Sequence, residues 1–341
     1  MRRLFTFRFV RPSIFAATAC ALGLAASLGG CRASVTEAGA ARTVSAAASY
    51  PSAVEEGSNS SAPYTPISAD GFPHGIPNGG PPDPTPVAYD RDIEIDEASK
   101  PNITGKAAIL VDDWGRVLYE KNADTRLPAA STQKLLLGIL IVENGNLSQR
   151  VTVADSDTWA EPTKMGIKTG QTYTREELLR AVLVRSSNDI ARALARDHSG
   201  SEAAFAANMN RRARELGMHN SYFTNASGLP TPAGQYSTAR DLAILGNAAL
   251  KKPFIRDAVR TKGLVFRFAD GTTKSITNTN ALLKSRDYCT GCKTGYTHAA
   301  GKCLVSSASA NGKNVLAVIL GSKTPTIWDE SDELLRYGLK M

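Results

Sequence analysis

The amino-acid sequence predicts an α+β domain over residues 101–341. Short apolar runs typical of strands occur at both ends of this region, and helical patterns fill its middle. Short glycine-containing turns join the runs of the last third, which indicates antiparallel neighbours. We therefore expect one sheet that joins N- and C-terminal segments, with a block of helices inserted between them.

Residues 1–30 are predicted to form a lipoprotein signal peptide. A basic start is followed at 13–28 by an apolar run that is too short and too rich in small residues for a membrane span. The sequence Leu28-Gly29-Gly30-Cys31 resembles the bacterial lipobox, so we expect Cys31 to be lipidated and to become the new N-terminus. A plain signal peptide with a chance cysteine is the alternative.

Residues 31–100 are predicted to form a disordered tether behind the lipidated cysteine. The stretch is rich in Ala, Ser, Gly and Pro, with GIPNGGPPDPTPV at 75–87, and it holds few large apolar side chains. Such a chain buries too little apolar surface to fold alone. As a coil it would span on the order of 45 Å, which would let the domain work away from its membrane. A segment that docks on the domain surface is the alternative.

The predicted domain begins with a hairpin and a helix. The apolar runs 107–111 and 116–120 flank Asp112-Asp113-Trp114-Gly115, with glycine at the turn. A helix is expected to start at Ser131 and to continue through the apolar run 135–142.

The middle of the domain is predicted to be helical. Thr174 and Glu177 form a capping box, which predicts a helix over 177–184. Further helices are expected at 190–195, from a cap at Ser201 to Leu216-Gly217, and over 238–250.

The last third predicts strands at 264–268, 292–296, 302–308 and 315–320, followed by a closing helix over 328–339. No internal repeat is present in the sequence.

The composition argues against a nucleic-acid partner. The formal net charge of the whole chain is +8, and loss of the four arginines in residues 1–30 would leave about +4. The sequence contains no basic cluster interleaved with aromatic residues and no Gly-rich phosphate loop.

Ser131 and Lys134 form a Ser-x-x-Lys motif at the predicted start of a helix. The three-residue spacing places the amine on the same face as the hydroxyl, one turn later. A desolvated lysine with a lowered pKa is one of the few side chains that can take a proton from serine. The alternative interpretation is a serine that caps the helix and a solvated lysine.

Two further motifs decide between these interpretations. Ser186-Ser187-Asn188 lies between two predicted helices, and Lys293-Thr294-Gly295 lies on a predicted strand. The order Ser-x-x-Lys, Ser-x-Asn, Lys-Thr-Gly is the signature of the penicillin-recognising serine enzymes. A second Lys-Thr-Gly at 168–170 precedes the Ser-x-Asn motif in a polar loop, and we do not expect it to take part.

The resemblance extends over about residues 103–340. The chain resembles the low-molecular-weight D-alanyl-D-alanine carboxypeptidases, the S11 serine peptidases, in the segments Arg126–Lys134, 170–174, Met209-Asn210, Leu216-Gly217-Met218, 225–229, Asn278-Thr279-Asn280 and 291–297. The resemblance implies a β-lactamase/transpeptidase-like fold with a five-stranded antiparallel sheet flanked by helices and a separate helical subregion. The active site is expected where the sheet meets the helices.

The resemblance also implies roles for the catalytic residues. Ser131 would attack the carbonyl between two D-alanines, with Lys134 as the base. Ser186 would relay a proton to the leaving D-alanine, and Asn188 would bond Lys134 and the substrate backbone. Lys293 would hold the Ser186 hydroxyl.

Substrate binding is expected along the Lys-Thr-Gly strand. Lys293 and Thr294 would receive the terminal carboxylate of the substrate, which gives carboxypeptidase specificity a physical cause. The backbone N–H groups of Ser131 and Tyr296 would form the oxyanion hole. Gly295 would let the ligand lie close along the strand.

Two features depart from the family pattern. Ser187 stands where members usually have glycine, and its side chain either points away or crowds the site. Cys289, Cys292 and Cys303 leave room for one disulfide in an exported protein, with three possible pairings. We expect a structural role for Cys292, and we expect neither a cofactor nor a metal, since no histidine stands at ligand spacing.

Three other functions remain to be weighed. A β-lactamase would need a positioned glutamate to hydrolyse its acyl-enzyme quickly. Glu215 is a poor match, because it lies at the predicted end of a helix. A D,D-endopeptidase that cuts peptidoglycan crosslinks is not separable by sequence. A non-catalytic peptidoglycan-binding module is disfavoured by the complete set of site residues.

The expected partners and location follow from the resemblance and from the leader. We expect peptidoglycan stem peptides as substrates, β-lactam antibiotics as acylating inhibitors and a membrane contact through the lipid on Cys31. Many relatives carry a further β-rich domain and an anchoring helix, which the lipid and tether are expected to replace. The protein is expected on the periplasmic side of a bacterial membrane. Because Arg32 and not Asp follows the cysteine, that would be the outer membrane in a Gram-negative host.

Overall fold

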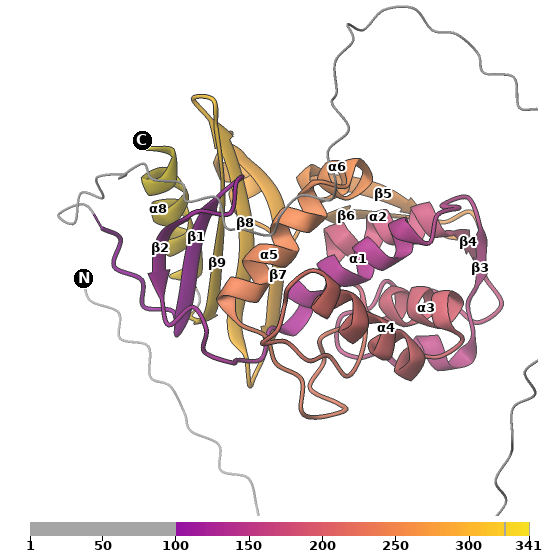
Figure 1. The fold of residues 1–341 in the computed structure, drawn as a ribbon. Coiled ribbons are helices and arrows are strands. Elements are labelled where there is room, and N and C mark those ends of the chain that lie inside the picture. The colour runs from indigo at the N-terminus through magenta and orange to yellow at the C-terminus, as the bar shows by residue number, and fades with distance from the viewer. Residues whose placement is uncertain (1–99, 324, 341) are drawn as a thin grey trace, which may run out of the picture. The chain divides into compact units, whose positions relative to one another are not determined.

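The structure, a computed structural model, describes residues 100–323 and 325–340 (Figure 1). The predicted signal peptide of residues 1–30, the predicted lipidation site Cys31 and the predicted tether up to residue 99 lie outside the described residues. No helix in the described part combines the length and apolarity that crossing a membrane requires.

A five-stranded antiparallel sheet joins the two ends of the domain, as predicted. The strand order is β2-β1-β9-β8-β7, so the first strands in the sequence pair with the last. In this pairing Ile109 lies opposite Val318. The strands are β1 (Ala107–Asp112), β2 (Val117–Lys121), β7 (Cys289–Thr297), β8 (Gly301–Ala310) and β9 (Lys313–Ser322).

The sheet separates two apolar cores. Alternate side chains of a strand point to opposite faces, so Ile109 and Val318 pack with the helical block, whereas Leu110 and Ala317 pack with the C-terminal helix α8 (Ile327–Leu339). Figure 1 shows α8 on one face of the sheet and α5 (Ala239–Leu250) on the other. The predicted closing helix and the helix at 238–250 are confirmed.

Helix α1 (Lys134–Glu143) lies in the middle of the helical block. Its residues from Lys134 to Ile141 are all buried, which is typical of a helix that is apolar on every side. The α-helix begins three residues later than predicted, because a 3-10 turn, η2 (Ala130–Gln133), carries Ser131. The surrounding helices are α2 (Arg175–Arg185), α3 (Asn188–Ser199), α4 (Glu202–Glu215) and α6 (Pro253–Arg260).

Helix starts follow the predicted caps. The Thr174 hydroxyl accepts from the backbone N–H of Glu177 at 3.1 Å, and the Glu177 carboxylate accepts from the Thr174 N–H at 2.8 Å, which is the predicted capping box. Ser201 accepts from the Ala204 N–H at 3.1 Å. These bonds satisfy N–H groups that have no partner inside the helix.

One predicted strand pairs differently from expectation. Strand β5 (Gly263–Arg267) pairs with β6 (Thr273–Thr277) in a separate two-stranded sheet and does not join the main sheet. Only Phe266 of β5 is buried, so the strand covers the helices with one face and leaves the other to solvent. The structure adds a short pair, β3 (Arg150–Thr152) with β4 (Thr172–Thr174), and two short helical segments, η3 (Asp155–Trp159) and α7 (Leu282–Ser285).

Candidate active site

The three predicted motifs meet at the junction of α1, the α2–α3 corner and strand β7. Ser131 lies in η2, and Lys134 is the first residue of α1. The Lys134 Nζ lies 2.7 Å from the Ser131 Oγ, as the three-residue spacing predicts.

Lys134 is fully buried and surrounded by oxygen atoms. Besides Ser131, its Nζ contacts Asn188 Oδ1 at 2.8 Å and the Ser227 carbonyl oxygen at 2.6 Å. Burial, and then the positive charge of Lys293, lower the pKa of Lys134 well below 10.5. A neutral amine has two N–H groups for the amide and carbonyl oxygens and a lone pair for the Ser131 hydroxyl proton. The arrangement therefore suits a proton acceptor.

Ser186 occupies a constrained corner between α2 and α3. It ends α2 with a φ of 69°, in the left-handed region that side chains other than glycine rarely adopt. Asn188 begins α3 two residues later, so the corner turns Ser186 toward β7 and Asn188 toward α1.

Lys293 is the second buried lysine of the site. Its Nζ donates to Ser186 Oγ at 2.7 Å and to the Thr294 carbonyl oxygen at 3.0 Å. Burial lowers the pKa of Lys293 to about 7. The Thr294 hydroxyl donates to Thr279 Oγ1 at 2.6 Å.

Gly295 packs against the turn that carries Ser131. A Cβ at this position would lie 2.9 Å from both the Ala129 carbonyl oxygen and the Ser131 nitrogen. Glycine is thus required for β7 to approach the turn that carries Ser131. The room that Gly295 would give to a ligand along the strand stays a prediction. The predicted oxyanion donors, the N–H groups of Ser131 and Tyr296, belong to these two closely packed segments. The Tyr296 ring is 58% exposed, with Lys302 Nζ 4.4 Å from its centroid.

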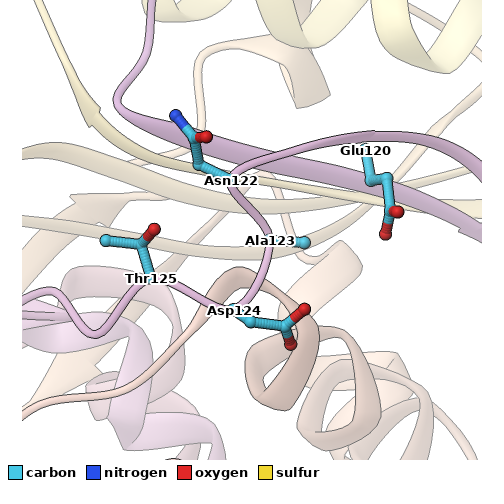
Figure 2. Close-up of a pocket in the computed structure, with 5 residues that line it drawn as sticks. All are labelled: Glu120, Asn122, Ala123, Asp124 and Thr125. Atoms are coloured by element: carbon cyan, nitrogen blue, oxygen red, sulfur yellow. The ribbon is translucent and has the colours of Figure 1, made fainter.

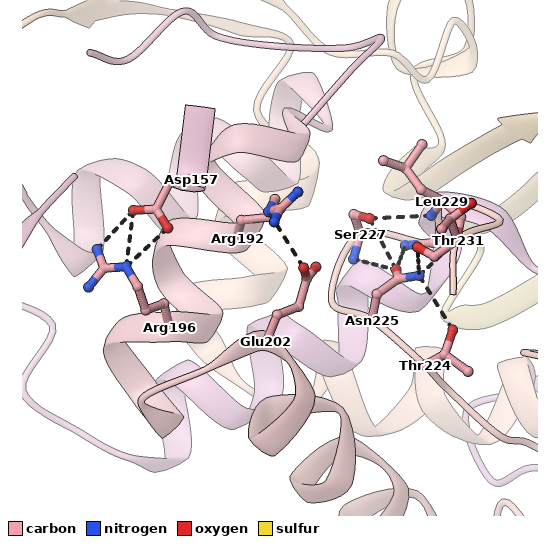
Figure 3. A network of polar contacts seen from close by, with 10 residues as sticks. Asp157, Arg192, Arg196, Glu202, Thr224, Asn225, Ser227, Leu229 and Thr231 are labelled. Atoms are coloured by element: carbon pink, nitrogen blue, oxygen red, sulfur yellow. Dashed lines mark hydrogen bonds and ion pairs between the residues drawn. The ribbon is translucent and has the colours of Figure 1, made fainter. Parts of the chain in front are cut away.

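No role is predicted for Ser227, whose carbonyl oxygen accepts from Lys134 Nζ. Asn225 shapes this loop: its Oδ1 accepts from Ser227 N–H at 3.0 Å, and its Nδ2 donates to Leu229 O at 2.7 Å (Figure 3). At Gly228, with φ 84°, a Cβ would lie 2.2 Å from Ala130 O. The segment 225–229 was part of the resemblance, but a backbone carbonyl carries no side-chain signal.

Asp189 is a second residue to which sequence reasoning gave no role. Its buried carboxylate accepts from the backbone N–H groups of Met165 and Gly166 at 2.9 and 2.8 Å. The neighbouring Asn188 N–H donates to Thr163 O at 2.7 Å. The loop before β4 is thus bonded to the start of α3, and in the last turn of α3 Arg196 pairs with Asp157 at 2.8 Å (Figure 3).

Ser187 and the three cysteines, the features that depart from the family pattern, are all buried. Ser187 is fully buried, and its Oγ has no hydrogen-bond partner among the described residues. The expected disulfide is wrong, because Cys289, Cys292 and Cys303 are free buried thiols that donate to separate acceptors: Gly291 O, Ser307 Oγ and Pro128 O. Burial raises the pKa of the Cys292 thiol to about 12, which suits a structural role.

Glu215 and the second Lys-Thr-Gly motif lie apart from the three predicted motifs. Glu215, at the end of α4, is half exposed and pairs with Arg212 at 3.1 Å and Arg211 at 3.7 Å. Lys168 of the second Lys-Thr-Gly is exposed and lies 3.8 Å from the Asp270 carboxylate. Neither is bonded to the motif residues.

A cavity of about 520 Å³ lies at the end of strand β2 and the loop after it, and none of the motif residues lines it. Glu120, Asn122, Ala123, Asp124 and Thr125 line it (Figure 2). Arg240 bridges the Glu120 and Asp124 carboxylates at 2.7 and 2.8 Å, so its two acidic side chains already have a partner.

Comparison with known proteins agrees with the geometry. Residues 94–324 match the peptidase S11 family, described as D-alanyl-D-alanine carboxypeptidase. The chain is 36% identical over 228 residues to D-alanyl-D-alanine carboxypeptidase DacF of Bacillus subtilis, which covers 64% of this chain and 58% of that protein. It is 31% identical over 243 residues to a D-alanyl-D-alanine endopeptidase of Escherichia coli, with 69% and 77% covered.

The fold also matches solved structures. An evolved penicillin-binding protein homologue, Rv2911, from Mycobacterium tuberculosis superposes with a TM-score of 0.68 at 31% identity. The match covers 71% of this chain and 94% of that one. The predicted transpeptidase-like fold is therefore confirmed.

Proposed function

We propose a function from the premise that the chain belongs to the peptidase S11 family: it is a serine D-alanyl-D-alanine carboxypeptidase that removes the terminal D-alanine of peptidoglycan pentapeptides. The observation that carries the proposal is the 2.7 Å contact between Ser131 Oγ and the buried Nζ of Lys134. The chain spans 58% of the Bacillus subtilis relative, so the proposal concerns the part they share.

The first step forms an acyl-enzyme. Ser131 Oγ attacks the carbonyl carbon of the penultimate D-alanine, while Lys134 Nζ takes the hydroxyl proton. The N–H groups of Ser131 and Tyr296 stabilise the negative oxygen of the tetrahedral intermediate. The C–N bond then breaks, and the leaving amine of D-alanine takes a proton through Ser186, whose hydroxyl is bonded to Lys293.

The second step restores the enzyme. A water molecule attacks the ester between Ser131 and the shortened peptide, the ester bond breaks, and Ser131 Oγ regains its proton through Lys134. Asn188 keeps Lys134 in place during both steps through its 2.8 Å bond.

Specificity for a free carboxylate follows from Lys293 and Thr294. A substrate without that carboxylate would leave the buried Lys293 amine and the Thr294 hydroxyl without that partner, which costs binding energy. β-Lactams carry a carboxylate in the same relation to a reactive amide, so we propose that they acylate Ser131.

The test uses the purified full chain, a fluorescent penicillin and a pentapeptide ending in D-Ala-D-Ala. We expect stoichiometric label on the chain and release of free D-alanine, and loss of both in Ser131→Ala. Label that persists in Ser131→Ala, or a folded wild-type chain that releases no D-alanine, would overturn the proposal.

A second candidate activity is D,D-endopeptidase, which the similarity to the Escherichia coli endopeptidase favours. This activity would also proceed through acylation of Ser131, but its substrate would be a crosslinked peptide of peptidoglycan. Comparison of D-alanine release from pentapeptide with cleavage of a crosslinked muropeptide dimer separates the two. Rapid penicillin turnover would instead indicate the β-lactamase alternative.

We also propose that the protein is exported and held by a lipid on Cys31 at the periplasmic side of a bacterial membrane. The lipobox and the basic, apolar leader support this proposal. Mass spectrometry of the mature N-terminus should find diacylglyceryl-modified Cys31. An unmodified N-terminus downstream of Cys31 would contradict the anchor.

A further inference from the structure

A cavity of about 370 Å³ opens between the α5–α6 corner and the sheet, and none of the motif residues lines it. Its walls come from the end of α5, from α6 and from strands β7, β8 and β9. Cavities that hold small organic ligands begin at about 300 Å³, so the volume suits a small molecule and exceeds the need of a single inorganic ion.

Three cationic side chains form one wall of this cavity. Arg256 and Arg260 stand four residues apart on α6 and therefore share one helix face, and Lys251 precedes that helix. Arg256 Nη1 donates to Leu250 O at 3.1 Å, which holds its guanidinium at the cavity rim.

These cations lack carboxylate partners, unlike several other arginines of the domain. Arg180 contacts Glu176 and Asp257, and Arg240 contacts Glu120 and Asp124. By contrast, none of the three cavity cations is ion-paired within residues 100–323 and 325–340.

The charge balance of the lining favours a doubly charged anion. Asp113 is the one carboxylate among the lining residues, and it accepts from Asn314 Nδ2 at 3.1 Å. Three cations against one carboxylate leave an excess of two positive charges. A phosphate monoester carries about −1.5 to −2 charges at pH 7, and guanidinium groups bind phosphate oxygens in pairs.

The opposite wall suits the organic part of such a molecule. The hydroxyls of Thr290 and Ser307 lie 2.8 Å apart at the strands and can bond a polar group. Leu250, Val315 and Leu316 supply apolar surface beside them.

We propose that this cavity is a binding site for a small organic phosphate monoester, with the phosphate held by Arg256, Arg260 and Lys251 and the organic part against the strands. The ligand is either a soluble phosphate ester or the phosphate headgroup of a lipid. The proposal does not depend on the catalytic function of Ser131.

Calorimetric titration of the full chain with glycerol 3-phosphate, and separately with dissolved dihexanoyl phosphatidic acid, tests the site. We expect saturable binding that weakens with added salt. Tighter binding of the lipid would identify a headgroup site, and equal or tighter binding of glycerol 3-phosphate a soluble ligand. No saturable binding of either compound at millimolar concentration would overturn the proposal.

The double variant Arg256→Gln/Arg260→Gln should lose about ten-fold or more in affinity, because two charge-assisted contacts are removed. Arg267→Gln on β5, an exposed arginine outside the cavity, is the matched control and should bind like the wild type. Penicillin labelling and melting temperature report whether each variant is folded, and Lys251→Gln replaces the double variant if that one unfolds. Unchanged affinity in the cavity variants, or an equal loss in Arg267→Gln, would contradict the site.

Discussion

Lys134 and Lys293 are both buried lysines of one site, but the protein holds them differently. Lys134 has three oxygen neighbours from three segments of the chain, Ser131, Asn188 and Ser227. Lys293 has one side-chain neighbour, Ser186, and otherwise contacts the carbonyl of the next residue on its own strand.

The difference indicates a division of roles. The oxygen atoms around Lys134 hold its amine beside the Ser131 hydroxyl, with no carboxylate bonded to its Nζ in the described part of the chain. Lys293 leaves part of its bonding capacity for an incoming carboxylate, and its positive charge lowers the pKa of Lys134. One lysine therefore suits proton transfer, and the other suits anion recognition.

The largest expected effect comes from removing Lys134, the proposed proton acceptor. Lys134→Gln should slow acylation by penicillin by about 10³-fold or more, since general-base assistance is typically worth 10²–10⁴. Stopped-flow measurement of acyl-enzyme formation checks this. Lys284→Gln, a substitution outside the site, is the control. If the Lys134 variant is acylated at a rate within ten-fold of wild type, the different roles inferred for Lys134 and Lys293 are contradicted.

Removing the other lysine should damage recognition as well as rate. Lys293→Gln is expected to lower kcat/KM for a pentapeptide by about 10²-fold, because the carboxylate loses a charged partner. It should also move the rising limb of the pH–rate profile to higher pH, since a positive charge near Lys134 is gone. A limb that moves to lower pH would contradict the coupling.

Removing a negative charge near Lys134 should move the rising limb of the pH–rate profile in the opposite direction, to lower pH. The Asp189 carboxylate raises the pKa of Lys134, so Asp189→Asn should shift the rising limb to lower pH. The variant should also unfold more easily, by about 2 kcal/mol, because buried N–H groups of the loop lose a charged acceptor. Urea unfolding and pH–rate profiles measure the two effects. A limb that does not move would limit Asp189 to a structural role.

A smaller effect should report on Lys293 directly. Its pKa of about 7 means that it is mostly neutral at pH 8 in the free protein. A bound carboxylate raises that pKa, so binding at pH 8 should take up a fraction of a proton. Titration of Ser131→Ala with a penicillin in two buffers of different ionisation enthalpy measures the uptake. Equal uptake after the further substitution Lys293→Gln would assign the proton to another group.

Contacts close in sequence were predictable, and contacts through space were not. The Ser131–Lys134 contact follows from helix geometry, and the Thr174 cap from the spacing of two side chains. The carbonyl of Ser227 and the packing of Gly295 against Ser131 depend on how distant segments meet. Backbone groups carry no residue-specific signal for such contacts.

The errors have the same origin. The sequence predicts the strand at 264–268 but not its partner β6, since most side chains of β6 are polar or exposed. The cysteine spacing suggested a disulfide, whereas each buried thiol is bonded to a separate oxygen. Strand pairing and thiol pairing both depend on tertiary distances that spacing alone does not fix.

The protonation state of Lys134 is the central claim, and an NMR titration of lysines labelled with ¹³C at Cε tests it most directly. Assignment comes from the Lys134→Gln spectrum. We expect the Lys134 signal to titrate well below pH 10.5, unlike the exposed lysines, and to move to higher pH in Lys293→Gln. A Lys134 signal that stays in the charged form up to pH 10 would contradict its role as the proton acceptor of Ser131.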